Sequence, residues 1–516
     1  MQRLLPTLLL FVASAAPATA PAGAQTTLRY DVDLADTVHH VFVVALRVPP
    51  LTAANDVFEF AATAPGAYQT MNIGRFVHDF TALDAAGAPI ATEHIGTNEW
   101  RLASPERVRR ITYRVTATRD TTVAEDRIYP MCGTSLDADY ALINGQGVFG
   151  FPRGMQAVPL TIHLSYPSRW TTGTPLTERG GDFVAASYDR LVDSPILLGA
   201  HLTRATLDVT GVPVTIVVRA TRNDIQATQL RDAMRSMLTA AGAFLGKLPV
   251  DHYTFLYDFG PPIPVSGAWE HSYGSEYVLP DAPYTPTYGA QVRSIAAHEF
   301  FHVMTPLNIH SEIIEHFNFA TPVASQHLWL YEGTTEWAAQ KMQLVSGLIT
   351  LPAYLDIMVQ KSRADRTQYD TTWSLQKMSL ASYSDSGQRQ YPNIYARGAV
   401  VAGLLDIRLL ELSDGKQGLR ELILDLAKQY GKQRPFSEAG FIDSIVARTS
   451  PTMRDFFDRY VLGTEAPPLK EYYGKVGITL IDDDKGVPLR FEIDAAATPE
   501  QLTLRSAWMG PQARIK

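Results

Sequence analysis

The stretch QVRSIAAHEFFHVM, residues 291–304, decides how the rest of the sequence is interpreted, because it carries the motif HEFFH. In a helix, residues four positions apart lie on one face with side chains about 6 Å apart, so His298 and His302 can bind one metal ion. Zinc suits two imidazole ligands, and Glu299 between them can act as a general base toward water. The spacing therefore predicts a zinc-binding helix.

The third ligand determines the class of zinc protein. A metzincin would have glycine and histidine where this sequence has Thr305 and Asn308, so that class is excluded. A carboxylate is needed instead, and Glu332 in LWLYEGTTEW is the best candidate, because it starts from an apolar helical face. Glu336 follows on the same side, and we expect it to accept a hydrogen bond from a ligand histidine, His298. Four alternative ligands lie nearby: Glu312, Glu315, His316 and His327.

Length and composition limit what the chain can be. Its 516 residues exceed the about 250–300 residues that one hydrophobic core usually serves, so we expect two or three domains. A content of 46% hydrophobic residues is typical of a folded globular protein. The net charge of -8, without a run of Lys or Arg, argues against nucleic acid as a partner. Cys132 is the sole cysteine, which excludes an internal disulfide and a thiolate metal site.

The first 24 residues have the features of a secretory signal peptide. Arg3 lies near the amino terminus, an apolar run follows, and small residues precede an expected cleavage point after Ala24. The run is shorter than the ~20 residues of a membrane span, so we expect no membrane anchor after cleavage. The sequence thus predicts an exported protein, located in the periplasm or outside the cell.

Hydrophobic periodicity divides the remaining chain into a β-rich part and a helical part. Up to about residue 219 the pattern alternates, as in HHVFVVALRV (39–48), and turn residues interrupt it, which predicts strands. From residue 223 the period is typical of helices, so we expect a mainly helical region as far as residue 462. Beyond Pro468 two strand-like pieces, GITLI and LRFEI, are too short for a core of their own.

Five motifs occur along the chain: PGAY (65–68), GAWEH (267–271), HEFFH (298–302), LWLYEG (328–333) and YARG (395–398). Their order and spacing resemble those of the glycyl aminopeptidases of metallopeptidase family M61, which belong to the gluzincins. The resemblance covers nearly all of the mature chain. After HEFFH the chain departs from the family's pattern and reads VMTPLNIHSE.

The resemblance implies an α+β multidomain fold. We expect an N-terminal all-β domain at residues 25–219, a thermolysin-like zinc catalytic domain at 220–347 and a C-terminal helical domain at 348–466. Members of the family often continue with a PDZ domain. Residues 467–516 leave room only for a C-terminal tail or a truncated PDZ-like segment.

The resemblance also implies roles for residues outside the zinc helix. Glu270 of GAWEH resembles the carboxylate with which gluzincin aminopeptidases bind the ammonium group of a substrate. Gly267 and Ala268 belong to the same substrate-binding edge of the cleft. Tyr395 of YARG resembles the tyrosine that donates a hydrogen bond to the tetrahedral oxyanion, with Tyr391 as the alternative.

The sequence therefore predicts a secreted zinc aminopeptidase that acts on peptides with small first residues such as Gly or Ala. One zinc ion per chain would be bound by His298, His302 and Glu332. Two alternatives remain open. A zinc endopeptidase of the same fold would result if Glu270 did not close the cleft. A non-catalytic binding protein with a relic zinc site is the other, although such a relic would not need Glu299.

Overall fold

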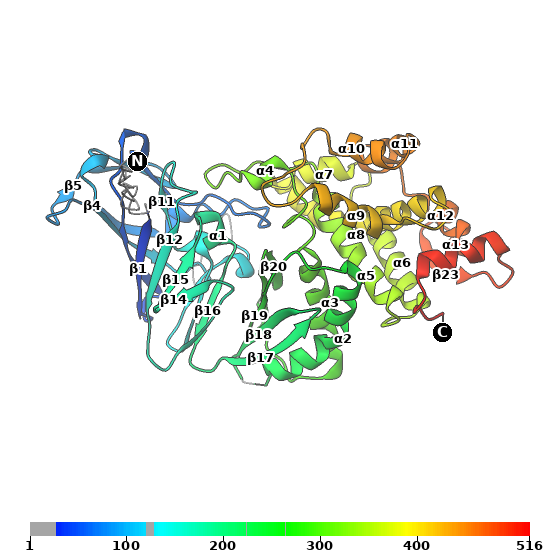
Figure 1. Ribbon diagram of the computed structural model, residues 1–516, viewed down its shortest axis with the longest axis horizontal. Coiled ribbons are helices and arrows are strands. Elements are labelled where there is room, and N and C mark those ends of the chain that lie inside the picture. The colour runs from blue at the N-terminus through cyan, green and yellow to red at the C-terminus, as the bar shows by residue number, and fades with distance from the viewer. Residues whose placement is uncertain (1–26, 120–127, 223, 264, 516) are drawn as a thin grey trace, which may run out of the picture.

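Alternating burial along β1 (Leu28–Asp36) explains why the N-terminal part forms sheets. Leu28, Tyr30 and Val32 are buried, whereas the residues between them are more exposed, so the strand has one apolar face. The computed structural model describes residues 27–119, 128–222, 224–263 and 265–515, and its β domain contains one eight-stranded and two four-stranded sheets (Figure 1). The expected signal peptide, residues 1–24, lies outside the described residues.

The eight-stranded sheet runs in the order β14 (Thr177–Arg179), β15 (Asp182–Ala185), β12 (Leu160–Ser165), β1, β2 (Val41–Arg47), β8 (Arg110–Thr116), β4 (Val77–Leu83) and β5 (Pro89–Ile90). One four-stranded sheet runs β13 (Thr171–Gly173), β16 (Ile196–Gly199), β10 (Tyr140–Ile143) and β9 (Ser135–Leu136). The other runs β11 (Phe151–Pro152), β3 (Val57–Glu59), β7 (Glu99–Leu102) and β6 (Thr92–Gly96). Side chains from all three sheets share one hydrophobic core.

A separate five-stranded sheet supports the candidate site. Its order is β17 (Thr203–Val209), β18 (Val212–Ala220), β19 (Tyr253–Gly260), β21 (Gly274–Pro280) and β20 (Gly267–His271). The strands β18, β19 and β21 are parallel, whereas β20 is antiparallel and ends the sheet. Figure 1 shows two helices beside this sheet, α2 (Ala227–Leu245) and α3 (Pro286–Phe301), and their apolar faces share a second core with it.

This sheet differs from the sequence-based expectation in two respects. The boundary expected between residues 219 and 220 falls inside it, because β18 ends at Ala220 and pairs with both β17 and β19. The region expected to be mainly helical also contains three strands. One of them, YTFLYDFG (253–260), is buried on both faces, so it lacks the alternation that reveals a half-exposed strand.

Helices form most of the remaining structure. They are α4 (Glu312–Glu315), α5 (Thr334–Val345), α6 (Leu351–Gln368), α7 (Leu375–Leu380), α8 (Asp385–Leu412), α9 (Leu419–Gln429), α10 (Phe441–Arg448) and α11 (Met453–Phe457), with π-helical turns η6 (Trp329–Gly333) and η7 (Asp458–Leu462). Within the described residues, α8 is the longest helix, and it packs against η6, α5 and α6. Buried residues run along most of its second half, so it forms the centre of the helical part.

The C-terminal segment folds onto the helical domain. It consists of α12 (Leu469–Lys475), β22 (Ile478–Asp482), β23 (Pro488–Ile493) and α13 (Pro499–Met509). Trp508 of α13 is 1% exposed and packs against Tyr354 and Tyr473, and the ammonium group of Lys341 donates to its carbonyl oxygen at 2.6 Å. The segment, too short for a core of its own, thus contributes to the core shared with α3, α5 and α8. Over the described part of the chain, every helix is too short or too polar to span a membrane.

Candidate active site

The motif HEFFH, residues 298–302, which we call the zinc-type motif, lies at the end of α3. Thr285 caps this helix by accepting from the backbone N–H of Tyr288, and Pro286 occupies its first turn, where a missing N–H costs nothing. His298 is in the last turn and His302 directly follows the helix. Their Nε2 atoms lie 3.1 Å apart, so the two imidazoles point at the same place.

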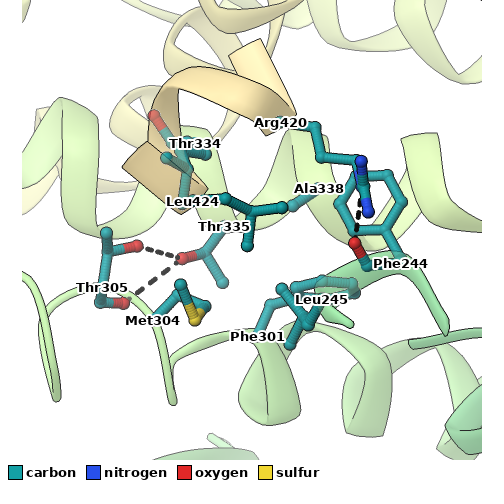
Figure 2. A pocket seen from close by; sticks show the side chains of 11 residues that line it. Phe244, Leu245, Phe301, Met304, Thr305, Thr334, Thr335, Ala338, Arg420 and Leu424 are labelled. Carbon is teal, nitrogen blue, oxygen red and sulfur yellow. Dashed lines mark hydrogen bonds between the residues drawn. The ribbon is translucent and has the colours of Figure 1, made fainter. Parts of the chain in front are cut away.

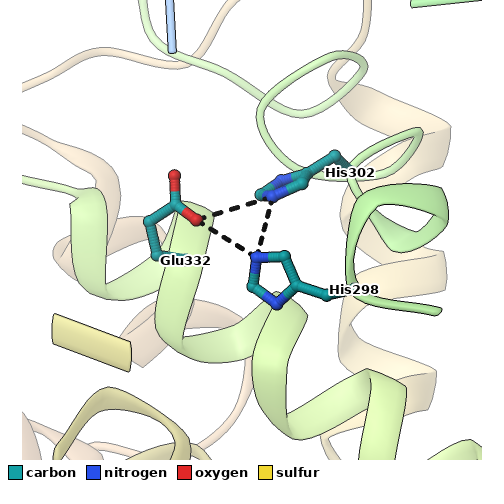
Figure 3. Close-up of side chains that lie close together, drawn as sticks. All are labelled: His298, His302 and Glu332. Carbon is teal, nitrogen blue, oxygen red and sulfur yellow. Dashed lines mark hydrogen bonds and ion pairs between the residues drawn. The ribbon is translucent and has the colours of Figure 1, made fainter. Parts of the chain in front are cut away.

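Glu332 reaches the same place from another element. It lies in the π-helical turn η6, a geometry that is frequent at functional sites. Its Oε2 atom lies 3.4 Å from His298 Nε2 and 3.5 Å from His302 Nε2, and Figure 3 shows the three side chains converging. His302 and Glu332 are each 1% exposed, and His298 is 9% exposed. These three side chains, called the metal-type group below, are therefore almost fully enclosed.

The hydrogen bonds behind the two histidines determine which of their atoms can bind a metal. His298 Nδ1 donates to Glu336 Oε2 at 2.8 Å, and His302 Nδ1 donates to the carbonyl oxygen of Thr305 at 2.8 Å. In the neutral rings, both Nε2 atoms then carry a lone pair toward the Glu332 carboxylate. Three buried acceptors that face one another suit a cation, either a metal ion or a proton: burial would lower the pKa of His298, but Glu332 and Glu336 outweigh it and raise that pKa well above its usual value.

The donor set fits zinc. Tetrahedral zinc with bonds of about 2.0–2.1 Å separates its ligand atoms by roughly 3.3 Å, and the three observed separations are 3.1, 3.4 and 3.5 Å. A second grouping, Glu270, Glu299 and His302, also lies within 4.8 Å. It contains one imidazole instead of two, so the first grouping suits zinc better.

Glu336, which accepts a hydrogen bond from His298, also forms an ion pair with a lysine. Lys361 of α6 lies 2.7 Å from Glu336 Oε1, while Oε2 of the same carboxylate accepts from His298. Burial alone would raise the pKa of Glu336, but Lys361 and His298 outweigh it and lower that pKa to about 2. The carboxylate therefore stays ionised and keeps the His298 ring in the tautomer that presents Nε2.

Thr305 and Thr335 contact each other next to His302. Thr335 Oγ1 lies 3.1 Å from Thr305 Oγ1 and 3.4 Å from the same carbonyl oxygen that accepts from His302 (Figure 2). Next to this pair is a cavity of about 10 Å³ with mostly apolar walls, including Phe301 and Ala338. A space of that volume holds one water at most, so it takes no substrate.

The alternative metal ligands have other partners. Glu315 lies 2.6 Å from His310 Nε2, Glu312 accepts from the N–H of Glu438, and His327 Nε2 lies 2.7 Å from the Glu438 carbonyl oxygen. His316 lines a cleft and belongs to no metal-type group among the described residues. The structure therefore brings together Glu332, and not these four, with the two histidines.

Glu299 and Glu270 lie next to the metal-type group. Glu299 is 7% exposed, and its pKa is raised to about 7, chiefly by burial. Glu270 is 8% exposed, and burial together with the charges of Glu332 and Glu299 raises its pKa well above the usual value. The site thus concentrates more negative charge than its surroundings neutralise, which suits a metal ion and a cationic ligand group.

The β domain closes against Glu270. Gly66 of PGAY has φ +78° and lies so close that an added Cβ would be 2.5 Å from Glu270 Oε1. The indole N–H of Trp269 donates to the Pro65 carbonyl oxygen at 3.1 Å, which fixes the loop to β20. Gly267 and Ala268 begin the same strand and are half-buried. The loop and the strand together form a wall around the Glu270 carboxylate.

A cleft of about 1170 Å³ opens beside this wall. Its lining includes Tyr68 from the β domain, Glu270 and His271 from β20, and Leu307 from the loop after α3. None of the three zinc-type ligands is in the lining. Glu270 therefore stands between the open cleft and the enclosed metal-type group.

Tyr395 covers the metal-type group from α8. Its ring centroid lies 5.4 Å from that of His298, and its hydroxyl is 2.8 Å from the hydroxyl of Tyr391. Burial would raise the pKa of Glu332, but the two histidines and a hydrogen bond from Tyr395 outweigh burial and lower that pKa. Tyr395 is thus within reach of an atom bound between the three ligands.

Two family models match the chain. The model of the peptidase M61 N-terminal domain matches residues 29–200, and that of the M61 glycyl aminopeptidase matches residues 291–401. Together they span more than half of the 516 residues. The chain belongs to peptidase family M61.

Solved structures share the fold of this M61 chain. An aminopeptidase N family protein from Idiomarina loihiensis has 21% sequence identity and a TM-score of 0.78, over 91% of this chain and 82% of its own. A mutant M1 zinc metallopeptidase from Deinococcus radiodurans, bound to the substrate Tyr-Ser-Ala, has 12% identity and a TM-score of 0.54, over 86% and 95%. No curated protein sequence matches the chain.

The M61 protein is therefore a metallopeptidase with a β domain, a zinc-peptidase-like catalytic domain and a helical C-terminal part. Membership of the family implies zinc, and the donor set described above fits that ion. The model of the glycyl aminopeptidase covers the zinc-type motif, Glu332 and Tyr395.

Contact between two glycines explains the close approach of η6 and α8. A Cβ on Gly333 would lie 2.6 Å from the Cα of Gly398, and one on Gly398 would lie 2.8 Å from the Cα of Gly333. Any side chain would separate the two backbones. These glycines therefore set the distance between Glu332, which precedes Gly333, and Tyr395, which lies three residues before Gly398.

Three features of the site lie beyond the sequence analysis. Lys361 has no motif around it, and the Thr305 carbonyl is a backbone group that no residue pattern reveals. Tyr68 belongs to PGAY, but its place beside Glu270 and α8 depends on how the β domain docks. For Gly333 and Gly398 a signal existed, because glycine within a helical pattern often marks a close backbone contact.

We predict that Glu332→Ala weakens zinc binding by more than the roughly 10- to 100-fold that loss of an outer hydrogen-bond partner costs, because a direct ligand is removed. Zinc content by mass spectrometry and competition with a chelator would measure this. Glu315→Ala is the matched control, and it should bind zinc like the wild type. The opposite result, zinc lost in Glu315→Ala and kept in Glu332→Ala, would refute the ligand assignment.

We also predict that Gly398→Ala destabilises the protein by about 1–3 kcal/mol through overpacking and weakens zinc binding, because η6 must move. Gly403→Ala on the same helix is the control, since its Cβ meets nothing closer than 3.7 Å. Denaturant unfolding with and without zinc would compare the two variants. Equal stability and equal zinc affinity would show that the glycine contact does not hold the site.

Proposed function

We propose that this metallopeptidase is a zinc-dependent aminopeptidase, which removes the first residue from peptides and prefers small residues such as Gly and Ala. One zinc ion per chain would be held by His298, His302 and Glu332. The observation that carries the proposal is the position of the Glu270 carboxylate. One of its oxygens lies within 4.8 Å of a carboxylate oxygen of Glu299 and a ring nitrogen of His302, and Gly66 of the β domain lies against it. A substrate ammonium bound there brings the first peptide bond to the metal position.

Zinc at this position supplies Lewis acidity, which acidifies water and polarises a carbonyl group at neutral pH. Glu299 accepts the proton of the attacking water and later passes it to the leaving amine. Its carboxyl group is enclosed beside the proposed metal ligands, where it can hold the proton between these two steps. Tyr395 donates a hydrogen bond to the oxyanion that develops on the scissile carbonyl.

The strand β20 supports the substrate. It ends the five-stranded sheet, and an extended peptide can pair with the edge that Gly267 and Ala268 begin. Peptide pairing at this edge aligns the main chain, while Glu270, farther along the strand, fixes the amino terminus. The description of the family, M61 glycyl aminopeptidase, supports the preference for Gly, and Ala is included as the next smallest residue.

We further propose that the protein is exported. The support is the sequence of residues 1–24, with its basic start, apolar run and small residues before the expected cleavage point. The mature chain would then begin at Gln25, which the intact mass of the exported protein would reveal. An intact mass that retains residues 1–24 would contradict export by this route.

The cleft favours a second candidate function, a zinc endopeptidase. About 1170 Å³ of space lies beside Glu270 on a lining that excludes the zinc-type ligands. Residues that precede the cleaved bond could occupy this space if Glu270 does not end the peptide path. An aminopeptidase requires a free amino terminus on its substrate, whereas an endopeptidase does not, so this requirement distinguishes the two functions.

We predict that Glu299→Gln binds zinc like the wild type but loses at least about 10²-fold in kcat, because the amide fills the same volume and cannot accept a proton. Zinc content and steady-state kinetics on an aminoacyl-amide panel would measure both properties. If the variant retained more than a tenth of the wild-type kcat, Glu299 would not be the general base.

We predict that Glu270→Ala lowers kcat/KM for free-amine peptides by roughly 10- to 150-fold, since it removes a charge-assisted hydrogen bond. N-acetylated peptides should be poor substrates of the wild type and lose much less. Glu59→Ala is the control, because Glu59 lines the same cleft but is held by Arg153 at 2.6 Å. Internal cleavage of acetylated peptides at the rate of free ones would replace the aminopeptidase by the endopeptidase.

A further inference from the structure

Two tyrosines of α8 form a hydrogen-bonded pair next to the metal-type group. Tyr391 and Tyr395 are four residues apart and so lie on one face of the helix. Their hydroxyl oxygens are 2.8 Å apart, and their ring centroids are 5.4 Å apart at an interplanar angle of 74°. Both side chains are half-buried: Tyr391 packs against the main core and Tyr395 against His298.

The direction of the hydrogen bonds follows from the chemistry of the groups. A carboxylate or an oxyanion can only accept, so a Tyr395 hydroxyl that faces either one donates its single proton to it. The oxygen of Tyr395 can then only accept from Tyr391. Tyr391 therefore donates to Tyr395, and it continues to do so if Tyr395 turns its proton toward a substrate oxyanion.

The β domain holds Tyr391 from the other side. The ring of Tyr68 lies 5.5 Å from that of Tyr391, tilted by 44°. Tyr68 has φ +45°, a left-handed conformation that is rare for an aromatic residue and usually marks a functional constraint. Its carbonyl oxygen accepts from Gln388 Nε2 at 2.6 Å, and Gln388 Oε1 accepts from the Tyr129 hydroxyl at 2.8 Å. The ring contact with Tyr391 and the hydrogen bond from Gln388 thus hold Tyr68 against α8.

We propose that Tyr391 is a positioning residue for the reaction: it orients the Tyr395 hydroxyl toward the scissile carbonyl and strengthens it as a donor. This inference rests on the role proposed above for Tyr395. A phenol that accepts a hydrogen bond is a better donor, because the two bonds polarise each other. The second bond also restricts rotation of the Tyr395 hydroxyl, so less order has to be imposed when the oxyanion forms.

A double-mutant cycle tests the proposal. Tyr395→Phe should lose about 10²- to 10³-fold in kcat, the usual effect of removing an oxyanion donor. Tyr391→Phe should lose roughly 10-fold in kcat with KM within about twofold, because substrate binding is not its task. The double variant should match Tyr395→Phe alone, since Tyr391 acts only through the missing hydroxyl.

A binding measurement provides a readout other than turnover. The Kd of a phosphinic dipeptide analogue, which mimics the tetrahedral oxyanion, should rise in the same order as kcat falls. Tyr354→Phe is the control, because Tyr354 is a fully buried tyrosine of the helical core, packed against Trp508. It should leave kcat, zinc content and analogue binding unchanged.

Four results would overturn the inference. Additive losses in the double variant, or an unchanged kcat in Tyr391→Phe when Tyr395→Phe is impaired, would show that Tyr391 does not act through Tyr395. A greater loss in Tyr391→Phe than in Tyr395→Phe would exchange the two roles. Full kcat in Tyr395→Phe would instead refute the proposed role of Tyr395, and the inference with it.

Discussion

The site depends on one constraint, the convergence in a buried space of the Nε2 atoms of His298 and His302 and a carboxylate oxygen of Glu332. His298 and His302 donate hydrogen bonds through Nδ1 to Glu336 and the Thr305 carbonyl oxygen, so both Nε2 atoms face Glu332. This arrangement favours a shared cation, because lone pairs and a carboxylate repel one another in a medium of low dielectric. The folded chain therefore holds a site that a zinc ion completes.

The elements around the site keep this arrangement in place. Lys361 neutralises Glu336 from α6, and the contact of Gly333 with Gly398 holds α8 against the turn that bears Glu332. The β domain supplies the remaining wall, where Gly66 meets Glu270 and Tyr68 meets Tyr391. The β domain, the five-stranded sheet and the helical part thus contribute to one site, which explains why the family's motifs are spread from residue 65 to residue 398.

Helix periodicity made part of the site predictable from sequence. The spacing of His298 and His302 places them on one face, and the structure brings Glu332 to them across 29 intervening residues. The three central strands were harder to predict, because β19 is buried on both faces and lacks alternation. Contacts such as Lys361 with Glu336, or Tyr68 with Tyr391, join distant segments, and local sequence contains no signal for them.

Anomalous diffraction at the zinc absorption edge, from crystals of the purified active protein, tests the central claim most directly. The account predicts one zinc peak per chain, about 2.0–2.2 Å from the Nε2 atoms of His298 and His302 and from a carboxylate oxygen of Glu332. A peak at Glu315 and His310 would contradict it. So would the absence of any peak from protein that retains full peptidase activity.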